Sequence, residues 1–346
     1  MPHDPLASRL APDPWCLRET RFDTATNFLH ETLFALGNGY IGLRGALEEG
    51  YNGPAGTSLD GTYLNGFYES ESIVYPEAAF GLAKTNQFML NVPNAKGVAI
   101  WLGEERFDLT EGSCAAYERR IDFRTGVLVR RLEWTAPSGK RIAFASRRLV
   151  SFAHKHLFAL EVELTPLNFS GPVALMAGID GAVKNQEAGD DPRVGSAVSG
   201  PALHLVGVEQ DAVFCSLVHR THNSGFTLVS AVATSVAGAE VRAAIPYRAG
   251  EAAGTRFELD AREGQAIRLT KYGVYYSSRD YEAGQLPALA RAALAQAQQG
   301  GFEALCAGQG SYLADFWAQA DVEIAGDDAL QQGMRCLLYT SPSPRD

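Results

Sequence analysis

Several features are missing from this sequence, and each absence narrows what the protein can be. None of its apolar runs approaches the roughly 20 residues of a membrane-spanning helix. Its start lacks the basic and then apolar pattern of a secretory signal. Its five cysteines are scattered and none forms a C-x-x-C pair, which is typical of reduced thiols. We therefore expect a cytoplasmic protein without a membrane partner.

An excess of positive charge is also missing. The 30 Lys and Arg residues are outnumbered by 40 Asp and Glu residues, which gives a net charge of −10. Such a balance argues against a nucleic acid or an anionic membrane as partner. A neutral partner such as a sugar is compatible with it.

Motifs of several well-known catalytic and metal sites are absent too. The chain contains no Gly-x-Ser-x-Gly elbow and no glycine-rich Walker loop. Two histidine pairs, at positions 154 and 156 and at positions 219 and 222, lack a third ligand at the spacing of a zinc site. We interpret them as surface or core histidines, and we expect no metal and no cofactor.

Short runs with period-2 alternation dominate residues 21–280. Phe158, Leu160 and Val162 alternate with other residues in one run, and Phe257 and Leu259 do so in another. This alternation predicts strands with one buried face and one wet face. Glycine, proline and asparagine turns separate the runs, and no helical pattern is recognised between them. We therefore expect a mainly β fold, a large antiparallel β-sandwich over residues 21–280, after a lead-in at residues 1–20.

The period changes after residue 280. An alanine-rich run predicts a helix near residues 285–299, with Pro287 in its first turn. A second apolar stripe predicts a helix near residues 310–319. A third helix is expected from the N-cap Asp327, with core spacing at Leu330, Met334, Leu337 and Leu338. Because these helices alone bury too little to form a domain, we interpret residues 281–325 as a helical linker.

A glycine-rich stretch at residues 31–49 stands out from the other runs. Four glycines lie within nine residues, which permits positive φ and close backbone approach. Its Gly37-x-Gly39-x-x-Gly42 pattern matches a dinucleotide-binding fingerprint, with Asp60 about 20 residues further on. That fingerprint has to open a helix, however, and glycines and a proline interrupt the segment that follows. A glycine-bent strand pair is the better interpretation.

A second segment, residues 61–69, has the same mixture of glycine, aromatic, amide and carboxylate residues. Because two segments of one chain share this composition, we expect them to form one patch, with the side chains of Asn38, Tyr40, Arg44, Glu48, Tyr63, Asn65 and Tyr68. Aromatic faces beside polar groups suit sugar recognition, although strands are rich in tyrosine for packing alone. We interpret Glu48, Glu49 and Glu69 as structural or interface acids rather than catalytic ones.

These two segments begin a series of short motifs. The others, in order, are NVPN (91–94), FDL (107–109), GVLVR (126–130), WTAPSG (134–139), RRLVSF (147–152), GIDG (178–181) and YYSSRD (275–280). In this order the motifs resemble the amino-terminal part of glycoside hydrolase family 65, which holds maltose, trehalose and kojibiose phosphorylases and some hydrolases. The resemblance covers about residues 20–335.

The resemblance implies that a helical (α/α)6 barrel follows the sandwich and carries the catalytic acid and the phosphate site. Residues 326–335 would begin that barrel, and the predicted patch would pack against it. The full-length enzyme would cleave an α-linked glucose disaccharide with inversion, using inorganic phosphate as co-substrate, to give β-glucose 1-phosphate. Disaccharide and phosphate would bind through the barrel, and a homo-oligomer is compatible with the family.

The family's general-acid motif has no counterpart in these residues, so we assign no catalytic residue and expect this chain to be inactive. Residues 336–346 resemble translated sequencing-adaptor read-through, so we expect a non-native tail there. A second interpretation is a stand-alone β-sandwich that binds carbohydrate or serves as a structural module. The amphipathic helices after residue 285 favour the enzyme, because a self-sufficient sandwich does not need them. The sequence does not choose among maltose, trehalose, kojibiose and nigerose, or between phosphorylase and hydrolase.

Overall fold

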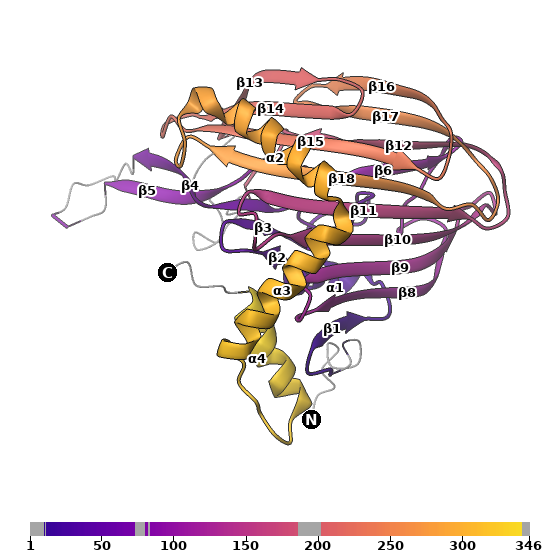
Figure 1. Cartoon of the computed structure of the whole chain (residues 1–346), viewed down its shortest axis with the longest axis horizontal. Helices are drawn as coiled ribbons and strands as arrows, with labels where there is room; N and C mark the ends of the chain where they lie inside the picture. The colour runs from indigo at the N-terminus through magenta and orange to yellow at the C-terminus, as the bar shows by residue number, and fades with distance from the viewer. Residues whose placement is uncertain (1–9, 11, 73–79, 82–83, 186–201, 341–346) are drawn as a thin grey trace.

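The computed structural model describes residues 10, 12–72, 80–81, 84–185 and 202–340, which form three antiparallel sheets and four α-helices (Figure 1). The expected mainly β fold is confirmed. No helix among these described residues is long and apolar enough to span a membrane.

The largest sheet has nine strands in the order β1-β8-β9-β10-β11-β18-β15-β14-β13. Its strands are β1 (Cys16–Glu19), β8 (Ser113–Asp122), β9 (Val127–Thr135), β10 (Arg141–Val150), β11 (Leu157–Pro166), β13 (Leu203–Gln210), β14 (Phe214–Thr221), β15 (Thr227–Ala237) and β18 (Ile267–Ser277). Strand β1 lies within the expected lead-in at residues 1–20, so the sheet includes residues from that segment.

Two smaller sheets complete the β part. The five-stranded sheet has the order β16-β17-β12-β6-β7 and the four-stranded sheet the order β2-β3-β4-β5. Their strands are β6 (Val98–Leu102), β7 (Glu105–Arg106), β12 (Gly171–Asp180), β16 (Val241–Ala249) and β17 (Ala252–Ala261), and β2 (Leu36–Gly37), β3 (Ile41–Leu43), β4 (Thr62–Ser72) and β5 (Thr85–Asn91).

The core lies where the nine-stranded and five-stranded sheets face each other. Trp134 and Phe144 come from the large sheet, and Ile100, Leu175 and Phe257 come from the smaller one, all in one buried cluster. Alternating residues of each strand supply this cluster, as the period-2 pattern predicted.

Two helices cover the other face of the nine-stranded sheet. After a single 3₁₀ turn, η1 (Ala283–Gln285), α2 (Leu286–Gly300) and α3 (Phe302–Ala320) run across it (Figure 1). Leu286, Ala290 and Leu294 of α2 pack with Val274 of β18 and Ala231 of β15. Both predicted helices exist, but α3 begins eight residues earlier than expected. Its first turns bury Phe302, Leu305 and Gln309 at helical spacing in spite of the glycines at positions 308 and 310.

The first helix, α1 (Thr24–Leu33), is absent from the sequence prediction, which placed no helix between residues 21 and 280. Asp23 caps it by accepting a hydrogen bond from the backbone N–H of Ala25. Its buried residues are the polar Asn27, His30 and Glu31, so it shows no apolar stripe. The pattern that matches the dinucleotide fingerprint opens no helix, since β3 occupies residues 41–43 and pairs with β4. The dinucleotide-binding interpretation is therefore wrong, and the stretch forms paired strands.

The last helix, α4 (Asp328–Thr340), begins where expected but turns a partly different face to the protein. Of the predicted core residues, Leu338 packs against the core and Met334 is half-buried. Its buried side chains are Gln331, Arg335 and Tyr339, whereas Leu330 and Leu337 are 55% and 65% exposed. The assignment of Leu330 and Leu337 to the core is therefore wrong. Arg335 stacks over Trp15 and pairs with Asp321, which fixes this orientation. Of the expected tail, residues 336–340 belong to this helix and residues 341–346 lie outside the described part.

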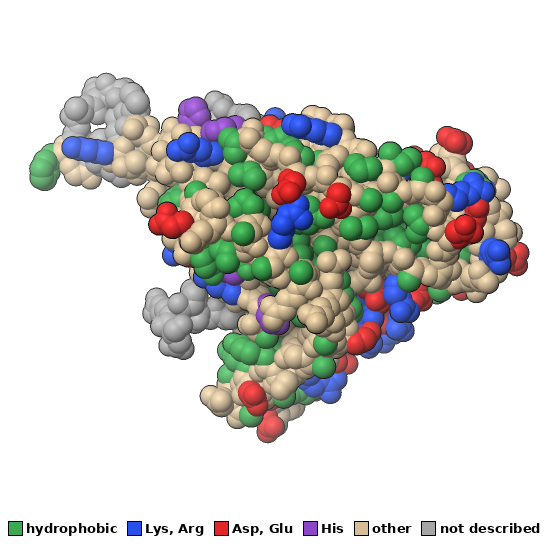
Figure 2. Space-filling view, turned by 45° about the horizontal axis from the view of Figure 1, so that its top comes forward, with side chains coloured by type: hydrophobic (Ala, Val, Ile, Leu, Met, Phe, Trp, Pro, Cys, Tyr) green, Lys and Arg blue, Asp and Glu red, His purple; other side chains and the backbone are tan. Residues whose placement is uncertain are grey.

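The surface mixes both signs of charge. Figure 2 shows acidic and basic side chains interspersed with hydrophobic ones over the visible face, without a large field of one sign.

Candidate functional site

The two glycine-rich segments lie side by side in the four-stranded sheet. Strand β3 pairs with β4 so that Ile41 is opposite Leu64 and Gly42 is opposite Tyr63. Six of the seven predicted site residues come from these strands or their flanking turns, and Glu48 comes from the loop beyond β3. The segments are neighbours as expected, but their side chains divide into separate groups.

The first group consists of two amides that brace the turn before β3. Asn38 accepts a hydrogen bond from the N–H of Ile41 at 2.8 Å and donates to the carbonyl of Ser151 at 2.6 Å. Asn65 donates to the carbonyl of Gly39 at 3.0 Å. Both side chains are therefore used inside the protein, and Asn38 holds residues 151–155 against the small sheet.

Tyr40 belongs to an aromatic cluster. Its ring meets His156 edge-on, with 4.6 Å between centroids, and His156 stacks on Tyr276 at 4.1 Å. Burial raises the pKa of Tyr40 to about 12 and lowers the pKa of His156 to about 4. His156 is therefore neutral at pH 7, with Nδ1–H donating to the carbonyl of Tyr275 and Nε2 accepting from Tyr281.

A cavity of about 290 Å³ lies beside this cluster, between the nine-stranded sheet and helices α2 and α3. His154, Lys155 and Tyr276 line one side, and Ala297 and Leu305 line the other. None of its lining residues is a carboxylate, so this cavity has no acid to protonate a leaving group.

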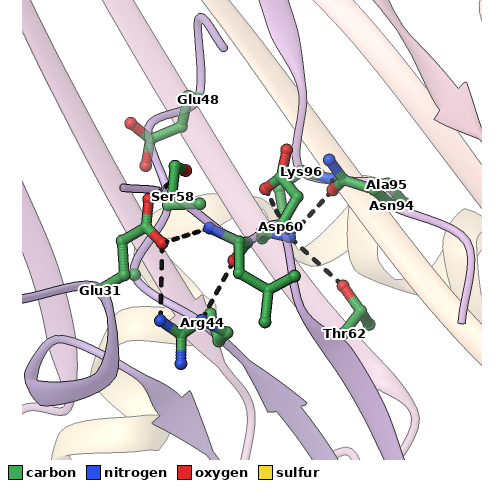
Figure 3. A network of polar contacts seen from close by, with 12 residues as sticks. Glu31, Arg44, Glu48, Ser58, Asp60, Thr62, Asn94, Ala95 and Lys96 are labelled. Carbon is green, nitrogen blue, oxygen red and sulfur yellow. Dashed lines mark hydrogen bonds and ion pairs between the residues drawn. The ribbon is translucent and has the colours of Figure 1, made fainter. Parts of the chain in front are cut away.

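Arg44 acts as a clamp between α1 and the segment before β4 (Figure 3). It donates to the carbonyl of Leu59 at 3.1 Å and to the carbonyl of Phe28 at 2.8 Å, and it lies 3.6 Å from Glu31. Tyr63 lies beside it at Gly61, where a Cβ would approach both side chains within 3 Å. The contacts of Arg44 are internal and hold the second glycine-rich segment in place.

Glu48 and its neighbour Glu49 are 4% and 1% exposed and bind arginines. Arg130 lies 3.0 Å from Glu48 and 2.8 Å from Glu49, and Arg148 lies 3.5 Å from Glu48. Burial opposes ionisation, but Arg130 and Arg148 hold the pKa of Glu48 below its usual value. For Glu49, burial outweighs the pairing and raises the pKa. Both contact sets agree with a structural role.

The remaining predicted residues lie further along β4. Tyr68 is half-buried opposite Met89 of β5. Next to it, Glu69 accepts hydrogen bonds from the N–H groups of Asn223 and Ser224, which hold its pKa below the usual value although burial opposes them. This carboxylate therefore anchors a neighbouring turn. The substrate-binding or barrel-facing role of the seven residues stays a prediction.

Two buried lysines were not singled out from the sequence. Nζ of Lys96 lies 3.0 Å from Asn94, 3.3 Å from Thr62 and 3.3 Å from Asp60 (Figure 3). Lys271 donates to the carbonyls of Gly97 and Gly178 at 2.8 and 2.7 Å and has no carboxylate at ion-pair distance among the described residues. A lysine inside a strand pattern gives no signal that separates it from an ordinary surface lysine.

Comparison with known proteins shows which family the chain resembles. Residues 17–316 match the model described as "Glycosyl hydrolase family 65, N-terminal domain". An α,α-trehalose phosphorylase of Thermoanaerobacter brockii is 39% identical over 324 residues, which are 93% of this chain and 42% of that protein. A kojibiose phosphorylase of Halothermothrix orenii is 29% identical over 335 residues, 94% of this chain and 40% of that protein.

A solved structure has the same fold. It is described as a putative kojibiose phosphorylase from human microbiome, with a TM-score of 0.83 and 22% identity over 95% of this chain and 41% of that one. The chain thus spans about two fifths of the length of the relatives it matches. From residue 17 to residue 316, the chain belongs to glycosyl hydrolase family 65 through its amino-terminal domain.

Proposed function

We propose that this chain is the amino-terminal portion of a phosphorylase that cleaves an α-linked glucose disaccharide with inorganic phosphate, releasing β-glucose 1-phosphate. We further propose that the chain alone has no catalytic activity. Inverting transfer needs an acid on the leaving oxygen and a nucleophile on the opposite face of the sugar.

The observation that carries this proposal is the engagement of the carboxylates near the predicted patch. Glu48 and Glu49 are paired with arginines, and Glu69 accepts backbone N–H groups. A catalytic acid must reach the scissile oxygen within hydrogen-bond distance. These three carboxylates instead hold the sandwich together, which supports the proposal that the catalytic pair belongs to a further part of the enzyme.

The outer face of α4 supports the same proposal. Leu330 and Leu337, about two helical turns apart, are exposed, and Tyr312 of α3 is 45% exposed. Clustered apolar side chains on a helix mark a contact surface. We propose that a further domain of the enzyme covers them.

Among the substrates in the relatives' names, α,α-trehalose is the first to test. The two trehalose phosphorylases are 39% and 34% identical to this chain, against 29% for a kojibiose phosphorylase and 26% for a maltose phosphorylase.

The test incubates the purified chain with phosphate and trehalose, maltose, kojibiose or nigerose, and assays glucose 1-phosphate and free glucose. We expect no turnover above a buffer blank, with the full-length Thermoanaerobacter brockii enzyme as positive control. Turnover by the 346-residue chain would place a catalytic pair within it and overturn the proposal.

A further inference from the structure

A second cavity lies on the solvent side of the five-stranded sheet. Along β6, Ala99 and Trp101 alternate with Val98, Ile100 and Leu102, whose side chains fill the core. Ala99 and Trp101 therefore point away from the core, and they line a cavity of about 340 Å³. This volume is at the lower end of the range for small-molecule sites, roughly 300–1,000 Å³.

Small residues make room for the cavity, and aromatic residues border it. Gly178 of β12 lines it, and the hydroxyl of Tyr247 lies 2.6 Å from the position a Cβ would take on that glycine. On the other side, the guanidinium groups of Arg106 and Arg256 lie 5.9 and 5.5 Å from the ring of Trp101. These contacts hold the indole, so the cavity has one fixed apolar wall.

Several polar atoms at this cavity have no partner among the described residues. They are Nδ2 of Asn94, Nε1 of Trp101, the hydroxyl of Tyr247, one carboxylate oxygen of Asp180 and Nε of Arg106, the last one buried. The donors and acceptors belong to separate strands and loops. Nε of Arg106 is buried without a partner in the described part of the chain, whereas Asn94, Trp101 and Tyr247 are half-buried and Asp180 is exposed. Together these groups offer both donors and acceptors to a ligand with many hydroxyls or to water.

The supporting contacts hold these groups in place. Asn94 and Asp180 exchange backbone hydrogen bonds at 2.8 and 2.9 Å, so their side chains leave neighbouring strands at one level. Behind them, Lys96 binds the side-chain oxygen of Asn94 and lies 3.3 Å from Asp60, which also lines the cavity (Figure 3). The amide nitrogen of Asn94 is thereby left as the free donor.

The charges around the cavity select a neutral ligand. Asp60 and Asp180 would repel a phosphate or a carboxylate, whereas Arg106 and the lysine behind Asp60 would repel a cation. Glu48 and Glu49 also line the cavity, but their charges are balanced by Arg130 and Arg148. Hydroxyl groups can both donate to the carboxylates and accept from the amide, indole and guanidinium N–H groups.

We propose that this cavity binds a neutral saccharide, with an apolar face of the sugar against Trp101 and its hydroxyls on Asp180, Asn94 and Tyr247. This binding site goes beyond the proposed phosphorolysis and does not depend on it.

The test is isothermal titration calorimetry of the 346-residue chain with glucose, trehalose, maltose and maltotriose, with inorganic phosphate and calcium chloride as charged probes. We expect saturable binding of at least one saccharide and of neither charged probe. Asp180→Asn should weaken saccharide binding about tenfold, because a hydrogen bond to a charged group is lost. Trp101→Ala should abolish it.

The matched control is Asp260→Asn, an aspartate of the same sheet that pairs with Arg242 and lies outside the cavity. Its saccharide affinity should equal that of the unaltered chain, and Asp180 is exposed, so its substitution should not impair folding. Absence of saturable binding, or equal affinity in the Asp180→Asn and Asp260→Asn variants, overturns the inference. Neither result bears on phosphorolysis, which turnover measures separately.

Discussion

Lys271 shows how strongly burial in this fold changes a single side chain. Its amino group is fully buried and binds two backbone carbonyls among the described residues, and burial lowers its pKa to about 7. An unfolded lysine titrates near pH 10.4. Between these two values the unfolded chain binds a proton that the folded chain does not, so stability falls as the pH is lowered from about 10 to 7.

We predict that Lys271→Met flattens this dependence. In urea denaturation between pH 7 and 9, the unaltered chain should gain stability with rising pH, and the variant should lose up to about 1.4 kcal/mol per pH unit of that slope. The control is Lys155→Met, since Lys155 is half-exposed. An unchanged slope in Lys271→Met would show that the lysine is charged in the folded protein.

The ion pairs of Glu48 could not be predicted from a local sequence pattern. Its partners Arg130 and Arg148 lie 82 and 100 residues away in the chain (130 − 48 and 148 − 48). We predict that Glu48→Ala lowers the free energy of unfolding by about 3–5 kcal/mol, because two arginines lose a buried counter-charge.

The matched control for this substitution is Glu133→Ala. Glu133 pairs with Arg141 at 2.9 Å, but both side chains are about half exposed, at 47% and 48%. Its loss should cost less than about 1 kcal/mol. Equal costs in chemical denaturation would mean that the buried pair contributes no more than a surface pair.

At the scale of elements, the strands could be predicted from period-2 alternation, as β17 shows. Strand β11 was predicted as a strand too, but it has no wet face over its first six residues, because Leu157 and Ala159 pack in the cluster that contains α2. Two helices could not be predicted correctly from the sequence: α1 was missed, and the buried face of α4 was assigned wrongly. Helix α1 buries Asn27, His30 and Glu31, which form hydrogen bonds with Thr57, Glu19 and Ser58 in other segments of the chain. Helix α4 packs mainly through Gln331, Arg335 and Tyr339 and leaves Leu330 and Leu337 exposed, so these two leucines were wrongly assigned to the core. In both helices, long-range polar contacts override the local pattern.

The candidate site divides in the same way. Composition alone brought the two glycine-rich segments together, since β3 and β4 are neighbours. Composition could not show that the side chains of Asn38, Arg44 and Glu48 bind partners inside the protein, because those partners are brought close only by the tertiary fold.

The bulge in β4 gives a prediction about one glycine. Gly66 has a φ of +74°, and a Cβ there would collide with Arg279, which donates to the carbonyl of Asn65 at 2.6 Å. Gly139 also has positive φ, +88°, but nothing lies within 4 Å of its Cβ position. Gly139→Ala should cost about 1–2 kcal/mol of backbone strain.

Gly66→Ala should cost about 1 kcal/mol more than Gly139→Ala, because Arg279 must also give up its hydrogen bond. Thermal or urea denaturation of both variants measures the difference. Equal destabilisation would show that Arg279 moves aside freely and that only φ matters.

At the scale of the whole molecule, the exposed face of α4 predicts self-association. We expect concentration-dependent association of the unaltered chain in sedimentation velocity. Leu330→Lys combined with Leu337→Lys should reduce it and leave the thermal midpoint nearly unchanged, since both leucines are exposed. The control pair is Val206→Lys with Val213→Lys, which are 54% and 47% exposed elsewhere on the surface. If both pairs act equally, the α4 face has no special affinity.

The central claim is that the sandwich and its helices are one part of a phosphorylase whose chemistry lies in another part. The most direct test compares phosphate-dependent release of glucose 1-phosphate from α,α-trehalose by the 346-residue chain and by a longer protein. In the longer protein, residues 1–335 are joined to the remaining portion of the Thermoanaerobacter brockii trehalose phosphorylase. The account predicts product from the longer protein and none from the chain alone. Product from the chain alone would contradict it.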